Sequence, residues 1–153
     1  MKLRNDGDLV KALGYLVLYT AYVEEAVDEC IDVFRQYFPD IDKQIARQTA
    51  KQKIKFIQTH LEANPPSDEL IQSQFPDLLK YLLSLFDARN EIIHGRIYGS
   101  LKFSEADTLI PGRPESKERA IAAKEIYDLA NEFFSMLNSL RQASYHSLHR
   151  YLK

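Results

Sequence analysis

Residues 9–34 read LVKALGYLVLYTAYVEEAVDECIDVF, and this stretch decides the fold. Its core-facing side chains recur at alternating spacings of four and three residues, which places them along one stripe of an α-helix. The stripe consists of Leu9, Leu13, Leu16, Thr20, Val23, Val27, Cys30 and Phe34. We therefore predict a long amphipathic helix over residues 8–38, which ends before Pro39.

Three further helices are expected along the chain. The second covers residues 42–63, the third covers residues 68–97, and the fourth covers residues 117–152. Pro76 lies inside the third segment, so that helix either kinks there or restarts with the proline in its first turn. The chain contains only 5 glycines and 6 prolines, which leaves these segments long and uninterrupted.

A long connection over residues 99–115, with two glycines and two prolines, precedes the last helix. A connection of that length is usually a functional loop or a disordered one. Four amphipathic helices with one long crossover predict an all-α fold, an antiparallel bundle of four to five helices. At 153 residues, the chain is expected to form a single domain over residues 1–153.

The charge of the chain is nearly balanced but unevenly distributed. The 20 cations and 22 anions give a net charge of −2, which excludes a protein that coats nucleic acid by bulk charge. Residues 41–63 nevertheless carry five cations and two anions, a local +3. Within them Lys43, Arg47, Lys51 and Lys55 recur every four residues. This row is either a solvated helix face or a track for phosphates.

The cysteine, histidine and hydropathy patterns limit which covalent links, metal sites and membrane segments are expected. The single cysteine, Cys30, excludes an internal disulfide framework and a cysteine-based zinc site. His146 and His149 lack a third ligand at a suitable offset, so neither a metal nor a cofactor is expected. The longest uncharged run, residues 12–23, is too short to span a bilayer. We expect a cytoplasmic protein that does not bind a membrane.

Arg89 is the anomalous residue of the third segment. At 100° per residue it falls near the centre of the side that carries Phe75, Leu82 and Phe86. A guanidinium cannot shed its charge, so in that position it needs a carboxylate, a phosphate or a route back to water. The helical wheel alone favours a structural ion pair or a side chain that reaches back to water. Glu24, at the edge of the first apolar stripe, is the candidate partner.

His94 stands five residues after Arg89, about 140° away on an ideal helix. One regular helix therefore does not bring the two side chains together. Gly95 follows directly, where the helix can loosen or end. Asn90 lies four residues before His94, so its amide is placed to orient the imidazole. Without further context, a lone histidine at a helix end is interpreted as a capping or surface residue.

Arg89, Asn90 and His94, in the string RNEIIHG of residues 89–95, resemble the signature of the HEPN superfamily. That signature is an arginine, usually followed by a polar residue such as asparagine, and a histidine four to six residues after the arginine. HEPN domains are small helical bundles with this motif near the end of the third main helix. The order and lengths of the expected helices agree with that arrangement over nearly the whole chain. Glu24 resembles the acidic position in the first helix of many members.

The resemblance implies a metal-independent endoribonuclease that acts as a homodimer in a toxin–antitoxin or other defence system. His94 would transfer a proton at the ribose 2′-hydroxyl or the leaving 5′-oxygen, and Arg89 would bind the scissile phosphate. Asn90 would orient His94 or the phosphate. The chemistry suits these residue types, because the 2′-hydroxyl is an internal nucleophile and an imidazole exchanges protons near neutral pH. The implied partners are an RNA substrate, a second copy of the chain and an antitoxin protein.

Arg96 marks a departure from the resemblance. Toxins paired with a nucleotidyltransferase antitoxin often carry a tyrosine two residues after the histidine, where this chain has Arg96, and Tyr98 comes two residues later. Arg96 is instead expected to hold RNA backbone, together with Lys51 and Lys55. Two alternatives stay open. One is a catalytically inactive HEPN-like domain that binds RNA, a nucleotide or a partner protein, and the other is a purely structural helical module.

Overall fold

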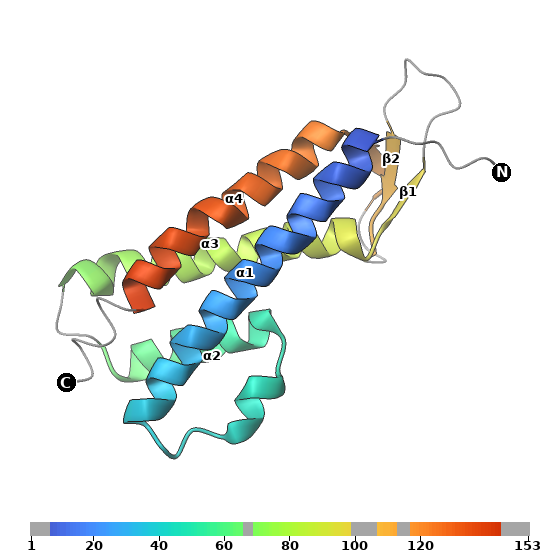
Figure 1. Cartoon of the computed structure of the whole chain (residues 1–153). Helices are drawn as coiled ribbons and strands as arrows, with labels where there is room; N and C mark the ends of the chain where they lie inside the picture. Colours follow the sequence, from blue (N-terminus) through green and yellow to red (C-terminus); the bar gives the residue numbers. More distant parts are fainter. Residues whose placement is uncertain (1–6, 66–68, 99–106, 113–116, 145–153) are drawn as a thin grey trace.

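The computed structural model describes residues 7–65, 69–98, 107–112 and 117–144, which form four α-helices, one 3₁₀ helix and three short strands (Figure 1). In chain order the elements are α1 (Gly7–Tyr37), the 3₁₀ helix η1 (Lys43–Arg47), α2 (Ala50–Ala63), α3 (Glu69–Ile93), β1 (Arg96–Tyr98), β2 (Asp107–Ile110), β3 (Arg119–Ile121) and α4 (Ala123–Gln142). The predicted helical character is confirmed, but the small sheet departs from an all-α fold. No helix in the described ranges has the length and apolarity needed to cross a membrane.

The most extensive helix contact joins α1 and α4, which run in the same direction (Figure 1). The ring of Tyr15 lies 6.0 Å from that of Tyr127, and farther along the pair Arg141 Nε lies 3.8 Å from Glu29 Oε2. The predicted antiparallel arrangement is therefore wrong for these two helices. The sheet explains the difference, because it follows the end of α3 and starts α4 at the end of the fold where α1 also starts.

The sheet is antiparallel with the strand order β1–β2–β3, and β2 lies within the predicted long loop. Leu109 of β2 pairs with Ile97 of β1 and with Arg119 of β3. Leu109 and Ile121 are buried in the same core as the helices. Because residues 119–121 pair with β2, the last helix begins at Ala123 rather than at the predicted residue 117. Its predicted end at residue 152 lies outside the described ranges.

The third helix ends at Ile93, before the predicted residue 97, and β1 begins at Arg96. Gly95 forms this junction under tight packing. A Cβ atom there would lie 2.5 Å from the carbonyl oxygen of Glu91 and 2.8 Å from that of Ile110. Only glycine tolerates such an approach without a shift of backbone. Upstream, Pro76 lies inside one continuous α3.

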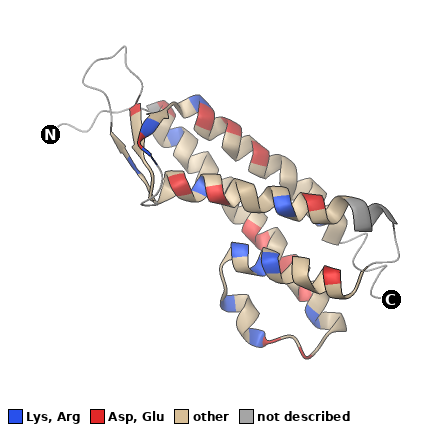
Figure 2. Ribbon diagram, turned by 180° about the vertical axis from the view of Figure 1, so that it is seen from behind, with Lys and Arg blue, Asp and Glu red and all other residues tan. Residues whose placement is uncertain are grey.

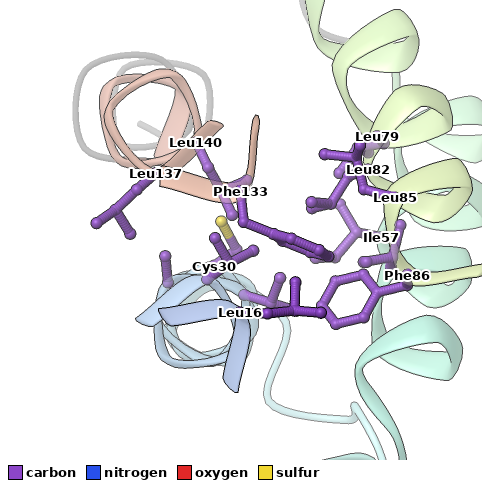
Figure 3. Packing of buried hydrophobic residues seen from close by; sticks show 14 of the residues in the cluster. Leu16, Cys30, Ile57, Leu79, Leu82, Leu85, Phe86, Phe133, Leu137 and Leu140 are labelled. Atoms are coloured by element: carbon purple, nitrogen blue, oxygen red, sulfur yellow. The ribbon is translucent and has the colours of Figure 1, made fainter. Parts of the chain in front are cut away.

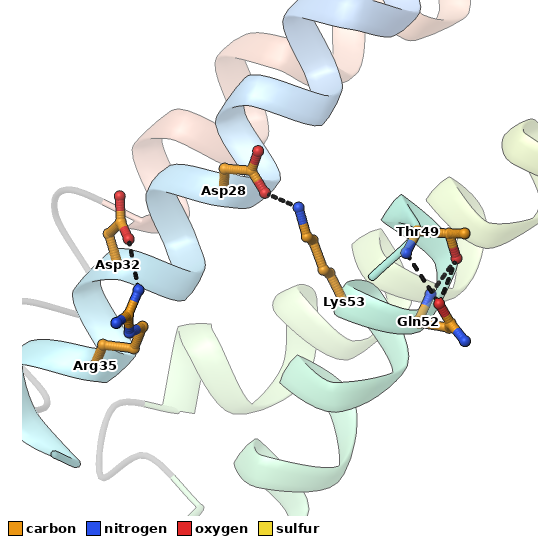
Figure 4. Close-up of polar contacts among 6 residues, drawn as sticks. All are labelled: Asp28, Asp32, Arg35, Thr49, Gln52 and Lys53. Carbon is orange, nitrogen blue, oxygen red and sulfur yellow. Dashed lines mark hydrogen bonds and ion pairs between the residues drawn. The ribbon is translucent and has the colours of Figure 1, made fainter. Parts of the chain in front are cut away.

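The predicted second helix over residues 42–63 divides into η1 and α2. The first part ends at Arg47, with Gln48 as its C-cap. Thr49 caps the second part, because its side chain and that of Gln52 exchange hydrogen bonds with each other's backbone N–H groups in a capping box (Figure 4). The cations spaced four residues apart therefore do not share one helix face. Lys43 and Arg47 belong to η1, whereas Lys51 and Lys55 belong to α2.

Side chains from all four helices fill the core (Figure 3). The predicted stripe of α1 is confirmed from Leu16 to Phe34, which are fully buried, as is Cys30 between them. Leu9 and Leu13 are only partly buried against the core. Across the core, the rings of Phe86 on α3 and Phe133 on α4 meet edge to face with centroids 5.2 Å apart. This contact fixes the last turns of α3, which carry the candidate site.

Candidate functional site

Arg89 lies in the last turns of α3, half-buried between the buried residues Phe86 and Ile92. Its Nη1 donates a hydrogen bond of 3.0 Å to Asn90 Oδ1. Its Nε is fully buried and has no hydrogen-bond partner among the described residues. A buried donor without a partner is costly, so Arg89 holds this position at a cost in stability.

A pocket of about 380 Å³ opens beside Arg89. One wall consists of Glu24 and Asp28 of α1, a second consists of the residues that lead into α2, and the third is the end of α3 with Asn90 and His94. Three helices that are distant in the sequence therefore place ionisable groups of both signs around one open space. A pocket with converging polar groups is where ligand binding is first expected.

Two lysines at the start of α2 face this pocket, and each is paired with a carboxylate. Lys53 Nζ lies 2.5 Å from Asp28 Oδ1 (Figure 4). Lys51 makes a close ion pair with Asp87, which lies on α3 two residues before Arg89. Figure 2 shows the blue Lys and Arg positions gathered on η1 and the start of α2. The two ion pairs bind α2 to α1 and to α3 and so hold the pocket walls together.

Lys53 was not among the residues singled out by sequence. Only 10% of its side chain is exposed, although lysine is rarely buried. A signal for this burial was present, because Lys53 precedes Ile57 by four residues and therefore lies on the apolar side of α2.

His94 is held by the junction of α3 and the sheet. Its backbone N–H donates to the carbonyl of Asn90 at 3.1 Å, which closes the last helical turn. Gly112 packs against it from the strand side, and a Cβ on Gly112 would lie 2.7 Å from the His94 carbonyl oxygen. The side chain of His94 is exposed at the pocket edge. The sheet missed by helical periodicity is thus the element that positions the histidine.

The structure brings together five of the residues singled out by sequence, because Glu24, Lys51, Arg89, Asn90 and His94 all line the pocket. Two specific contacts expected among them are absent from the described part of the chain. No ion pair joins Glu24 to Arg89, and the side chain of Asn90 accepts a hydrogen bond from Arg89 instead of orienting the imidazole of His94.

Two residues expected to contact RNA do not line the pocket. Lys55 is exposed on α2, and Arg96 is exposed on β1. The side chain of Lys55 is exposed because it lies about 100° from Ile54 and about 160° from Ile57 around α2, away from the buried face of that helix. Both cations remain available at the surface of the elements that carry the pocket.

The remaining histidine and cysteine that the structure describes lie apart from the pocket. His60 packs among the rings of Phe34, Phe38 and Phe56, and burial lowers its pKa from the ordinary value of 6.5. Burial raises the pKa of Cys30 to about 12. Across the described ranges no three metal-binding side chains cluster, and His146 and His149 lie outside those ranges.

The chain matches no known family in a scan of family profiles, and comparisons with curated proteins and with solved structures find no match.

Proposed function

We propose that the protein is a HEPN-like, metal-independent endoribonuclease that cleaves RNA by attack of the ribose 2′-hydroxyl, at a site completed by a second copy of the chain. The observation that carries the proposal is the meeting of Arg89, Asn90 and His94 with Glu24 and Lys51 around one open pocket. The family resemblance assigns Arg89, Asn90 and His94 to RNA cleavage and gives Glu24 a counterpart in the first helix, whereas Lys51 comes from the row of cations in the second segment. Beside this pocket, Arg89 keeps its Nε buried and without a partner among the described residues.

The proposed reaction divides the work between an imidazole and a guanidinium. A His94 side chain accepts the proton of the 2′-hydroxyl while its oxygen attacks phosphorus. The bond from phosphorus to the 5′-oxygen breaks, and that oxygen takes up a proton. The products are a 2′,3′-cyclic phosphate and a 5′-hydroxyl end. Arg89 hydrogen-bonds the phosphate oxygens as negative charge builds on them.

Asn90 and Glu24 act as supporting residues in this proposal. Because Asn90 Oδ1 accepts from Arg89 Nη1, it fixes the plane of the guanidinium, a role that replaces the expected contact with His94. Glu24 and Asp28 supply negative charge on the opposite wall, so that the cations are balanced before RNA arrives. Lys51, with Lys55 and Arg96 on the surrounding surface, would hold neighbouring phosphates of the backbone.

A homodimer supplies what one chain lacks. The reaction needs one group that removes a proton and another that delivers one, and each described chain brings a single histidine to the pocket. Two copies with their pockets facing each other would provide two imidazoles and two guanidiniums. In this setting the protein would act as a cytoplasmic toxin or defence effector, held inactive by an antitoxin protein.

One observation favours a second candidate function, a catalytically inactive HEPN-like domain. The pocket contains two carboxylates, and both of its lysines are already paired with carboxylates. That mixture of charge weakens attraction for a long polyanion and suits a nucleotide or a partner protein. The two functions differ in what they require, since binding tolerates loss of His94 whereas cleavage does not.

Incubation of the purified protein with a structured RNA in EDTA tests the nuclease directly. We expect products that end in a 2′,3′-cyclic phosphate, and their loss in Arg89→Ala and His94→Ala. Arg35→Ala is the matched control, because Arg35 lies on α1 outside the pocket and its ion pair with Asp32 is long, at 4.0 Å. Inactivity of a dimeric wild-type protein, with binding of the same RNA retained in His94→Ala, would favour the binding domain.

Expression in a bacterial host gives a second readout. A toxin should slow growth of the host, and His94→Ala should relieve that effect at equal protein levels. If neither Arg89 nor His94 affected binding, cleavage or growth, only the structural helical module would remain.

A further inference from the structure

The walls of the pocket differ in charge, and this difference limits which part of an RNA each wall can bind. Arg89 and His94 lie on the α3 wall, where the proposed reaction places the scissile phosphate. Glu24 and Asp28 lie on the α1 wall. Because carboxylates repel phosphates, an RNA chain in this pocket has to keep its backbone away from α1. The α1 wall is therefore left for an uncharged part of the RNA, which is a base.

Glu24 is the hydrogen-bond acceptor that the α1 wall leaves available. It is half-buried and has no hydrogen bond or ion pair within the described ranges. Asp28 is already engaged, because its Oδ1 accepts a hydrogen bond from Lys53 Nζ at 2.5 Å (Figure 4). An ionised carboxylate accepts hydrogen bonds and donates none, and its two oxygens can take two neighbouring donors at once. Glu24 thus suits a ligand edge that carries two adjacent N–H groups.

A donor lies close to this acceptor. Asp28 follows Glu24 by one helical turn and holds the ammonium group of Lys53, so that ammonium also lies near Glu24. An ammonium group has three protons, and Asp28 takes one of them. Lys53 lines the pocket and so has a proton left for an acceptor on the ligand. The α1 wall and the start of α2 together offer a double acceptor beside a donor.

We propose that this wall binds a guanine base next to the scissile phosphate, with Glu24 accepting from N1–H and N2–H and Lys53 donating to O6. Guanine is the RNA base whose Watson–Crick edge carries two adjacent donors followed by an acceptor. Adenine and cytosine place a ring nitrogen with a lone pair beside a single amino group, and uracil places its one N–H between two carbonyls. A carboxylate repels those acceptors. Bases of single-stranded RNA are commonly read through this edge.

The size of the pocket agrees with one nucleotide. Its volume of about 380 Å³ lies in the range of pockets that hold small molecules, which leaves room for a base and its phosphate rather than for a long segment of RNA. The inference deepens the proposed function by naming the base that the site selects, and it rests on that function for the RNA that carries the base. Glu24 then determines specificity in addition to balancing the cations.

Binding of four 2′-deoxy trinucleotides that differ only in the central base tests the wall without cleavage, because they lack the attacking hydroxyl. By equilibrium dialysis, the wild type should bind the guanine trinucleotide about 10- to 100-fold more tightly than the adenine, cytosine and uracil versions, the range for one bidentate base contact. Glu24→Gln should remove this preference, because the amide accepts one N–H and its own NH₂ opposes the second. Glu25→Gln is the matched control, because Glu25 is the next residue, is exposed and does not line the pocket.

Two further variants separate contacts to the base from contacts to the phosphate. Lys53→Met should reduce the preference for guanine severalfold, because it removes the donor to O6. Arg89→Ala should instead weaken all four trinucleotides by a similar factor, about tenfold, because its guanidinium binds phosphate whichever base is present. A purely structural role of Glu24 or Lys53 would also lower the affinity for all four bases alike and leave the preference unchanged.

Cleavage supplies the second readout. In polyuridine with a single guanosine, the wild type should cut beside the guanosine, and Glu24→Gln should cut without this preference. Equal wild-type affinity for the four trinucleotides, or a preference for guanine that survives in Glu24→Gln, would overturn the proposal.

Failure of the proposed function is distinguishable from failure of the base site. A guanine preference in binding without cleavage of any RNA would support the base site and refute the nuclease, whereas cleavage without any base preference would do the reverse. Guanosine monophosphate that bound more tightly than the guanine trinucleotide would overturn RNA as the source of the base and assign the wall to a free nucleotide.

Discussion

Replacing Asp28 is expected to destabilise the protein more than replacing Lys53, although Asp28 is the more exposed member of this ion pair. The side chain of Asp28 is 53% exposed and that of Lys53 is 10% exposed. Asp28→Asn leaves a nearly buried ammonium without its carboxylate. Lys53→Met removes the buried charge, keeps an unbranched apolar chain in the same space, and leaves a carboxylate that water can solvate.

The burial of Asp28 and Lys53 determines how much each substitution should change the free energy of unfolding. Loss of the partner of a buried charge costs about 3–5 kcal/mol when both groups are sealed from water. Here the pocket is open on the side of Asp28, so we expect about 1–3 kcal/mol for Asp28→Asn. Replacement of the buried charge by a well-packed apolar chain is often neutral, so Lys53→Met should change stability by less than about 1 kcal/mol. The double variant should resemble Lys53→Met.

Urea unfolding at pH 7, followed by circular dichroism, measures these differences. With a urea slope of about 2 kcal/mol/M, the Asp28→Asn midpoint should fall by about 0.5–1.5 M. Asp32→Asn is the matched control, because Asp32 is 72% exposed and its contact with Arg35 spans 4.0 Å, so its effect should stay below about 0.5 kcal/mol. Equal or greater destabilisation by Lys53→Met would show that Lys53 is solvated and that the reasoning from burial is wrong.

Three further outcomes are expected. Gly112→Ala should lower stability by about 1–3 kcal/mol and slow any RNA cleavage, because its Cβ would lie 2.7 Å from the backbone of His94 and displace it; unchanged unfolding and activity would contradict this. The wild type should lose stability relative to His60→Phe as pH falls below 6.5, because the lowered pKa means that the unfolded chain takes up a proton before the folded one does. Parallel urea midpoints for the two proteins from pH 7.5 to 5 would exclude that linkage. Cys30, whose pKa is raised to about 12, should resist alkylation at pH 8 in the folded protein and react in denaturant, as mass spectrometry would show.

Helical periodicity predicted the long helices because it is a local property of the chain. The apolar stripe of α1 repeats over many turns, and its residues from Leu16 to Phe34 are buried, together with Ala26, Ile31 and Val33, which the spacing did not indicate. The strands have only three or four residues each, too few to carry a periodic signal. Their pairing joins residues far apart in the chain, such as Leu109 with Ile97, and local reasoning does not reach such contacts.

In the candidate site, local patterns likewise predicted the residues but not the contacts between them. Arg89 attracted attention because a charge fell on an apolar face, and Asn90 and His94 followed from their spacing to it. The predicted contacts within the group were wrong in detail, because Asn90 hydrogen-bonds Arg89 and no ion pair joins Glu24 to Arg89 in the described ranges. Lys53 was missed, since its partner Asp28 lies 25 residues away and no local pattern pairs them.

By itself, the sequence determined which segments become long helices, where the chain must turn, and that a cation would lie on a buried face, because propensity and periodicity act over a few neighbouring residues. The tertiary structure alone decided that α1 and α4 run in the same direction, that a sheet positions His94, and that residues of three helices surround one pocket. Those features depend on which distant surfaces bury each other, and that choice is made only when the whole chain packs together.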